Sequence, residues 1–413
     1  MTVASGFDHA RAGALRAAAL DVLHKNRRET DGSQYTVPSP STYPYQWLWD
    51  SCFHAIVLAR VSPEDAKREI RSLLSRQFDN GMLPHMIYWQ RGPQIPIEWG
   101  MGETSSITQP PIIAEASWKI YEHTGDESFL KEVYPHLFHF YNYLLTERNP
   151  RGHDLAGIIN PDESGEDNSP RFDEGLGLPS QHTIRQSLEK RMQLVEELRS
   201  CKFDAPFCMR EFFWVKDVPF NAMLTYNLEV LARISEEIGF GEEAAIYREK
   251  SKKVATAMRE RMFEDGVYWS TAGRDFGKIK VKTWAMFAPL YAGLLSQAEA
   301  RTLIDEHLLN QKEFKTTYLL PTVSLDEPSF DPAGFWRGPV WIGTNWFVFR
   351  GLLRYGRTDV ALRVLESSMA LLERSGFREY FNPETGEGYG AEQFTWGALV
   401  VDMLEEAKAA ELI

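Results

Sequence analysis

Apolar residues recur at intervals of three and four over most of the chain, which is the spacing of one face of an amphipathic helix. Strand-like runs are short, as at 266–270, and strands do not alternate with helices around a glycine-rich phosphate loop. The sequence therefore predicts an all-α protein. The predicted helices span residues 10–25, 64–77, 112–122, 128–146, 185–199, 218–237, 242–262, 298–309, 341–355, 359–375 and 395–409.

The junctions between these helices share a pattern in which an apolar helix ends at a small or turn-forming residue and an acidic helix start follows. The pattern occurs at 60–65, 123–127, 238–242, 295–299 and 355–359. The intervals are similar except for one of about twice the length, which a further junction near residue 182 would divide. We therefore expect six helical hairpins closed into an (α/α)6 barrel, with residues 1–413 forming one catalytic domain.

Several connections on one side of the predicted ring are long and aromatic, at 79–110, 147–184 and 311–338. An open solenoid of helix pairs is the alternative, although solenoid repeats are usually shorter, about 34 to 47 residues. Long loops gathered on one face of a ring favour a funnel-shaped site.

The composition excludes a disordered or collagen-like chain, since 43% of the residues are hydrophobic and 25% are charged. Lys and Arg total 45 against 58 Asp and Glu, and the net charge of -13 disfavours nucleic acid or an anionic membrane as a partner. No run of about 18 apolar residues is present, and the first residues do not resemble a secretory signal. Cys52, Cys201 and Cys208 have neither metal-site spacing nor an evident pairing, so we expect reduced thiols in a cytoplasmic protein, without metal or cofactor.

The aromatic residues give the first functional indication. Many of the 12 tryptophans lie in polar segments rich in Gly and Pro, at 43–49, 88–99 and 335–346. Flat apolar side chains beside hydrogen-bonding groups suit the binding of sugar rings. An aromatic core is an equally good explanation at this point.

Residues 161–173 combine five acids with one arginine and with Ser, Gly and Asn. Such a segment forms turns readily, and its oxygen ligands could also bind calcium, although the EF-hand pattern is not met. The third interpretation is catalytic, with one carboxyl kept protonated by burial and by its acidic neighbours. Glu379 lies among aromatic residues just before an Asn-Pro-Glu-Thr-Gly turn, either as an enclosed carboxylate or as an exposed glutamate on a hairpin.

Four segments, taken in order, resemble those of family 63 glycoside hydrolases and, more distantly, of trehalases. Residues 163–171 (Glu-Ser-Gly-Glu-Asp-Asn-Ser-Pro-Arg) resemble the segment that carries the general acid of that family. Residues 336–341 (Trp-Arg-Gly-Pro-Val-Trp) resemble a segment at its sugar site, and Trp-Leu-Trp-Asp at 47–50 resembles its early Trp-Asp segment. Residues 379–386, followed by Phe-Thr-Trp at 394–396, resemble the segments near the C-terminal end of the family's catalytic domain.

The resemblance implies an inverting mechanism with Asp167 as general acid and Glu379 as general base. The two carboxyl groups are then expected to meet at one end of the ring, about 6.5–9.5 Å apart, with a water between them and the sugar. Position 166 is Glu, where a bulky residue is common in relatives, and this leaves open which of the two adjacent acids donates the proton. We favour Asp167 and expect Glu166 to raise its pKa.

The same resemblance implies a pocket in which Asp50 binds sugar hydroxyls. Arg337 would orient a carboxylate or bind substrate, with a structural ion pair as the alternative. Tyr88 and Gln109 bracket a loop at 91–107 that is a candidate lid. The expected substrate-binding residues are Tyr43, Trp47, Trp49, Asp50, Tyr88, Gln109, Trp336, Arg337 and Trp341.

Compact members of the family from bacteria act on mannosylglycerate and glucosylglycerate, so the leading hypothesis is hydrolysis of one or both. The alternatives are a trehalase- or kojibiose-type glucosidase, a sugar epimerase or isomerase, and a sugar-binding protein without catalysis. Epimerases on this barrel use paired histidines, and His136 with His139 on one helix face is more simply explained by core packing. The expected partner is a small glycoside, and a homo-oligomer is left open.

Overall fold

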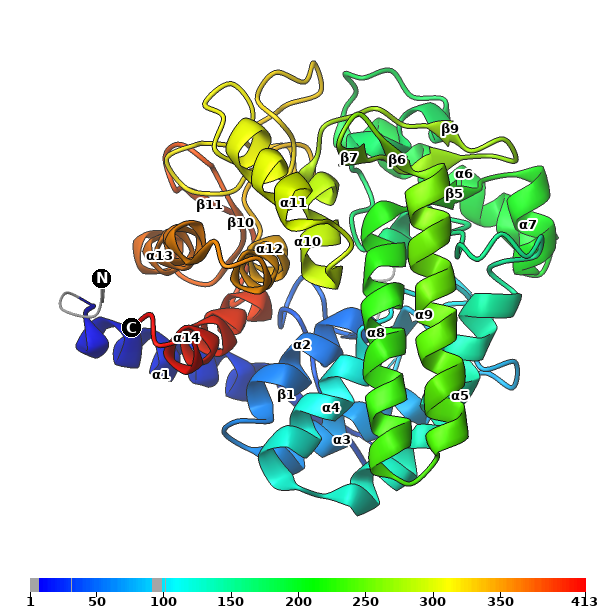
Figure 1. Cartoon of the computed structure of the whole chain (residues 1–413), viewed down its shortest axis with the longest axis horizontal. Helices are drawn as coiled ribbons and strands as arrows, with labels where there is room; N and C mark the ends of the chain where they lie inside the picture. Colours follow the sequence, from blue (N-terminus) through cyan, green and yellow to red (C-terminus); the bar gives the residue numbers. More distant parts are fainter. Residues whose placement is uncertain (1–6, 31, 91–98, 101) are drawn as a thin grey trace. The chain divides into compact units, whose positions relative to one another are not determined.

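The computed structural model in Figure 1 describes residues 7–30, 32–90, 99–100 and 102–413. The chain is mainly helical. Its α-helices are α1 (His9–Asn26), α2 (Leu48–Leu58), α3 (Pro63–Leu74), α4 (Ile113–Thr124), α5 (Glu127–Thr146), α6 (Ile184–Ser200), α7 (Ala205–Glu211), α8 (Val218–Glu237), α9 (Gly241–Arg261), α10 (Ala288–Ala292), α11 (Gln297–Leu303), α12 (Ile342–Arg354), α13 (Thr358–Ser375) and α14 (Leu399–Ala409).

Short strands and tight helical turns connect these helices. The strands are β1 (Arg27–Thr30), β2 (Ser33–Thr36), β3 (Gln46–Trp47), β4 (Met86–Ile87), β5 (Val215–Lys216), β6 (Phe263–Glu264), β7 (Val267–Tyr268), β8 (Thr271–Ala272), β9 (Gly277–Lys278), β10 (Arg378–Phe381) and β11 (Gly388–Glu392). The 3-10 helices are η1 (Pro161–Ser164), η2 (Pro170–Phe172), η3 (Glu174–Leu176), η4 (Trp284–Phe287) and η6 (Thr395–Ala398), and η5 (Ile304–Leu308) is a π-helix.

Most of the predicted helices are confirmed, but α2 was missed because it has no polar face. All of its residues from Leu48 to Leu58 are buried, so the alternation of apolar and polar positions that marks a surface helix is absent. The short helices α7 and α10 were missed as well. The predicted helix 298–309 divides into α11 and the wider turn η5, and the strand-like run at 266–270 contains β7, which pairs with β6.

The chain divides into two compact units. Of the described residues, those within 1–28, 36–44 and 282–413 form unit 1, and those within 29–35 and 45–281 form unit 2. In unit 2, α2 packs on α3, α4 on α5, and α8 on α9, the last two lying side by side in Figure 1. In unit 1, α12 packs on α13, and α1 packs on α14.

Cap chemistry explains where several of these helices turn. Gly125 ends α4 in the left-handed conformation (φ 64°), and the next residue, Asp126, accepts a hydrogen bond from the amide of Phe129 at 3.1 Å to start α5. Ser296 caps α11 in a capping box. The predicted junctions at these positions therefore contain the helix caps that the sequence pattern indicates.

The predicted junction near residue 182 is wrong as a hairpin. Thr183 does cap α6, but what precedes it is a series of 3-10 turns rather than a long helix. A strong cap marks a helix start without saying what lies before it. In the described residues the first helix, α1, instead packs on the last, α14, a pairing between chain ends that a search for local junctions does not detect.

The expectation of three free thiols is also wrong. Cys201 follows the last turn of α6, Cys208 lies in α7, and the two form a disulfide. The tight corner between the two helices brings residues seven apart in sequence into bonding range. Cys52 is free and buried in α2, and burial raises the pKa of its thiol. In the described part of the chain, no helix has both the length and the apolar character needed to cross a membrane.

Candidate active site

The acidic segment of unit 2 is built on two 3-10 helices, η1 and η2, rather than on an open loop. Asn160 caps η1, and Gly165 ends it with a positive φ of 75°. A side chain at Gly165 would begin 2.1 Å from the Trp49 ring, so only glycine allows the indole to pack on this turn. The sequence Ser-Gly-Glu-Asp thereby brings the acids next to Trp49 at the start of α2.

Glu163 is an anchor of this segment and is fully buried. Its carboxylate accepts hydrogen bonds from Arg148 at 2.7 and 2.5 Å, and from the amides of Thr108 and Ile159 at 2.9 and 2.8 Å. A carboxylate with this many donors is stabilised as an ion. These contacts fix the segment in place.

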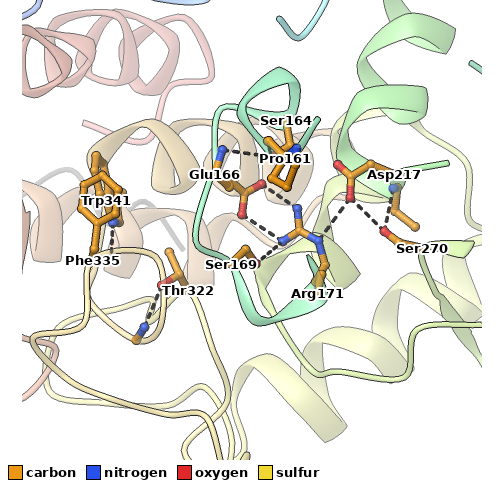
Figure 2. Close-up of polar contacts among 12 residues, drawn as sticks. Pro161, Ser164, Glu166, Ser169, Arg171, Asp217, Ser270, Thr322, Phe335 and Trp341 are labelled. Atoms are coloured by element: carbon orange, nitrogen blue, oxygen red, sulfur yellow. Dashed lines mark hydrogen bonds and ion pairs between the residues drawn. The ribbon is translucent and has the colours of Figure 1, made fainter. Parts of the chain in front are cut away.

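Glu166 is held in a similar way, as Figure 2 shows. Arg171 donates to both of its oxygens at 2.9 and 3.0 Å and also contacts Asp217 at 3.2 Å, which in turn accepts from Ser270 at 2.9 Å. The side chain of Glu166 is buried against this arginine. Of the two adjacent acids, Glu166 therefore has a structural ion pair.

Asp167 has a different environment, because a fifth of its side chain remains exposed (20%). One guanidinium nitrogen of Arg191, from α6, lies 2.5 Å from Asp167 and 2.7 Å from Asp162. Burial raises the pKa of Asp162 to about 7, with the negative charge of Asp167 contributing in the same direction and Arg191 opposing it. Two carboxyl groups thus share one arginine, and Asp162, with its raised pKa, is partly protonated near pH 7.

The remaining predicted residues of unit 2 gather around the N-terminal end of α2. Trp49 and Asp50 are buried in its first turn, and Trp47, half-buried, precedes it. The side-chain oxygen of Gln109, from the segment before α4, accepts a hydrogen bond from the amide of Trp49 at 3.3 Å. Tyr88 is buried nearby on the strand side, with its ring 5.5 Å from that of Tyr45 in an edge-on contact.

In unit 1, Glu379 lies on β10 and is enclosed rather than exposed (4%). The hydroxyl of Tyr43 donates to one carboxylate oxygen at 2.6 Å, and the amide of Ala391 on β11 donates to the other at 2.8 Å. Gly390 has a φ of 66°, and a side chain there would begin 2.3 Å from the second oxygen. The hairpin and its glycine hold this carboxylate in one orientation, with both donors stabilising its charge.

The aromatic segments of unit 1 form a stack beside Glu379. The rings of Trp336 and Trp341 lie 3.9 Å apart and nearly parallel (5°), and Tyr380 stacks on Trp341 at 5.2 Å. The Trp341 indole donates to the carbonyl of Phe335 at 3.0 Å, a contact drawn in Figure 2. Both tryptophans are almost fully buried, and Arg337 is buried in the same turn. This burial is what an aromatic core predicts, and a role of these residues in sugar binding stays a prediction.

Sequence reasoning missed several residues that support these groups. Arg191 looks like an ordinary charge on an amphipathic helix, and only its burial (6% exposed) reveals that it faces inward. Tyr43 was expected to bind sugar, and the structure adds a contact to Glu379. Gly390, in a Gly-Tyr-Gly sequence, was detectable only as a turn residue.

Other expectations concern histidine, metal and a lid. His139 is exposed and His136 contacts Gln77 at 2.7 Å, so core packing is the wrong explanation for this pair. In the part of the chain that the structure covers, no group of three or more His, Cys, Asp or Glu could hold a metal ion. Of the candidate lid at 91–107, residues 91–98 and 101 lie outside the described residues.

Comparison with known proteins adds independent information. The model of the mannosylglycerate hydrolase MGH1-like glycoside hydrolase domain matches residues 43–397. A mannosylglycerate hydrolase from Thermus thermophilus is 35% identical, over 92% of this chain and 98% of its own length. A glucosylglycerate hydrolase from Mycolicibacterium hassiacum is 30% identical, over 94% of this chain and 96% of its own.

Solved structures agree with this. Crystal structures of the family 63 mannosylglycerate hydrolase of Thermus thermophilus, in complex with Tris and with Tris plus D-glycerate, match with TM-scores of 0.87 and 0.86. Each is 33% identical to this chain and covers 95% of it and all of the other chain. The expected fold class, an all-α (α/α)6 barrel, is confirmed by this match and by the helix pairs. The chain belongs to the MGH1-like family of glycoside hydrolases, within family 63, as its four motifs predicted.

Proposed function

We propose that this protein is an inverting α-glycoside hydrolase that cleaves 2-O-α-mannosylglycerate, glucosylglycerate or both to hexose and glycerate. The activities of its named relatives support both parts of the substrate, and a solved relative that holds D-glycerate supports the aglycone. The observation that carries the proposal is the contrast between Asp167, partly exposed beside a shared arginine, and Glu379, enclosed with both oxygens accepting hydrogen bonds. An inverting enzyme needs one carboxyl to give a proton and another to take one.

Glu379 is the proposed general base. Tyr43 and Ala391 occupy one acceptor site on each oxygen, and a carboxylate has about four such sites. We propose that the carboxylate oxygens also accept a hydrogen bond from the attacking water. The base takes a proton from that water as the oxygen bonds to the anomeric carbon on the face opposite to the leaving group.

Asp167 is the proposed general acid, which protonates the glycosidic oxygen as the bond to the anomeric carbon breaks. The Arg191 guanidinium that contacts Asp167 also contacts Asp162, whose pKa is raised to about 7 by burial. We assign one proton to this carboxyl pair near neutrality. Substrate that covers Asp167 excludes water and favours the proton on that side of the pair.

The sugar-binding roles remain proposals of the same kind. Asp50 is proposed to hydrogen-bond the hexose hydroxyls, and tryptophans to line the ring faces, because flat apolar surfaces suit a hexose. The proposed substrate-binding set is Tyr43, Trp47, Trp49, Asp50, Tyr88, Gln109, Trp336, Arg337 and Trp341.

We also propose that both compact units belong to one catalytic domain. The support is that the family model runs through both of them without interruption, over residues 43–397. A cytoplasmic location stays a prediction, and its argument from free cysteines no longer holds because Cys201 pairs with Cys208. Homo-oligomerisation is likewise untested.

The experiment is incubation with mannosylglycerate, glucosylglycerate, trehalose and kojibiose, followed by NMR of the hexose first released. The β-anomer from a glycerate glycoside is the expected product, and an α-anomer would contradict the roles assigned to Asp167 and Glu379. Activity confined to trehalose or kojibiose would instead favour a disaccharide glucosidase.

Two variants test the residue roles. Asp167→Asn and Glu379→Gln should each reduce kcat by at least about 100-fold while substrate still binds. The matched controls are Asp265→Asn and Glu384→Gln, because both carboxyls are exposed. Equal activity in a catalytic variant and its control would remove that residue from the mechanism.

A further inference from the structure

Unit 2 contains a group of basic residues for which the described parts of the chain provide no ion-pair partner. Its members are Arg151, Arg210, Lys216, Arg261 and Arg274, and none forms an ion pair with a carboxylate in the described parts of the chain. In contrast, the buried arginines that contact the acidic segment, Arg148, Arg171 and Arg191, each form an ion pair with a carboxylate. Unmatched positive charge is unexpected in a chain with a net charge of -13.

Three of these arginines line one cavity. Arg151, Arg210 and Arg274 surround a volume of about 240 Å³ whose apolar wall includes Phe213 and Trp214. The pairing of β5 with β8, with Val215 opposite Ala272, holds the wall next to the turn that carries Arg274. The labels α7 and β5 mark this region in Figure 1.

Lys216 supports the cavity wall from behind and is itself almost fully buried (1%). Its ammonium lies 3.6 Å from the centre of the Trp214 ring and 4.5 Å from that of Phe276, and it donates to the carbonyl of Gly273. The Arg151 guanidinium contacts the same Trp214 ring at 5.6 Å. The indole is therefore covered by two cations rather than by an acid.

Electrostatics at this wall is correspondingly unfavourable. Burial lowers the pKa of Lys216 to about 7, with Arg151 and Arg261 adding to the effect and Asp275 opposing it. Burial also lowers the pKa of His153, and the positive charges of Arg261, Lys216 and Arg151 lower it further. Asp275 offsets this repulsion only in part, and a bound anion would offset more of it.

We propose that this cavity binds a small phosphorylated molecule, with the phosphate held by Arg151, Arg210 and Arg274 and a flat or apolar part against Phe213 and Trp214. Guanidinium groups present donors in a planar fork that matches phosphate, and several of them favour a doubly charged anion over a single carboxylate. The volume is below the about 300–1,000 Å³ of pockets for drug-sized ligands, so the ligand is small. The site uses none of the residues assigned to glycoside hydrolysis and does not depend on that assignment.

The test is calorimetric titration of the full-length protein with phenyl phosphate and with inorganic phosphate, at constant ionic strength. We expect saturable binding, tighter for phenyl phosphate because its ring adds apolar contact. Arg151→Gln and Arg274→Gln should each weaken it about tenfold or more, since each removes hydrogen bonds between charged groups. Arg185→Gln is the control, because Arg185 is highly exposed on α6.

Three results would overturn the proposal. They are the absence of saturable binding, equal binding by all three variants, and phosphate binding that survives in both cavity variants but competes with a glycoside substrate. Arg274 is exposed on a turn, so its variant is expected to fold, and circular dichroism with a thermal melt checks this for each protein. Both cavity variants should hydrolyse glycosides as the wild type does.

Discussion

Replacing Gly390 by alanine is expected to disable Glu379, the proposed general base, while leaving the protein folded. The new methyl group would lie 2.3 Å from the carboxylate oxygen that accepts from Ala391, where ordinary contacts begin at about 3.4 Å. The oxygen must therefore move by about 1 Å, and a displacement of that size at a reacting group costs about 100-fold in rate. Gly390 also has a φ of 66°, which costs an alanine about 1–2 kcal/mol of stability.

Gly125→Ala separates the collision with the carboxylate from the backbone cost of a positive φ. Gly125 has a φ of 64°, and no other atom lies within 4 Å of the position that an alanine Cβ would take, so it carries the backbone cost without the collision. Both variants should lose a similar free energy of unfolding, with a somewhat greater loss for Gly390→Ala because the Tyr380 ring and the Glu379 Cβ are also close.

The assay combines kcat and KM for mannosylglycerate with a thermal melt of each protein. We expect a folded Gly390→Ala protein with kcat lowered about 100-fold, and a Gly125→Ala protein with wild-type kcat. A Gly390→Ala protein with wild-type kcat would refute the reasoning, because it would mean that the position of this oxygen does not matter. Equal losses of kcat in the two variants would refute it as well.

Three further predictions follow from the polar contacts. Tyr43→Phe removes one hydrogen-bond donor from Glu379, the proposed general base, and should lower kcat/KM about tenfold or more in steady-state kinetics. Arg148→Met leaves Glu163 buried without its cation and should cost about 3–5 kcal/mol in urea unfolding. The pKa of Asp162 is raised from 3.8 to about 7, so between these pH values the folded state binds a proton that the unfolded state has lost. The resulting contribution to the free energy of unfolding is fully present below about pH 4 and is lost as pH rises to about 7. Asp162→Asn should remove that loss in denaturant titrations.

Each of these has a control from an exposed site. Tyr121→Phe removes a tyrosine–glutamate hydrogen bond at the surface and should leave kcat/KM unchanged. Arg185→Met breaks an exposed ion pair and should change stability by less than about 0.5 kcal/mol. A pH dependence of stability that is the same in Asp162→Asn and in Asp265→Asn would show that Asp162 does not retain its proton.

The helices of this protein were largely readable from local patterns. Amphipathic spacing persists wherever one face meets solvent, so α8, with predicted and observed bounds at Val218 and Glu237, could be delimited from the sequence. The same logic failed for α2, where both faces are buried and no polar face marks the period. Cap residues located helix starts but did not identify the partner of α1, because packing between chain ends leaves no local signal.

The sequence by itself determined the fold class, the family and the candidate acids, because helical periodicity and short ordered motifs are properties of neighbouring residues. Only the tertiary structure decided what each acid does with its charge. Glu166 forms an ion pair with Arg171, whereas Asp167 shares Arg191 with Asp162. Glu379 accepts a hydrogen bond from Tyr43, which is 336 positions away in the chain. Burial and the identity of a partner depend on long-range packing, and those two quantities set whether a carboxyl is an anchor, an acid or a base.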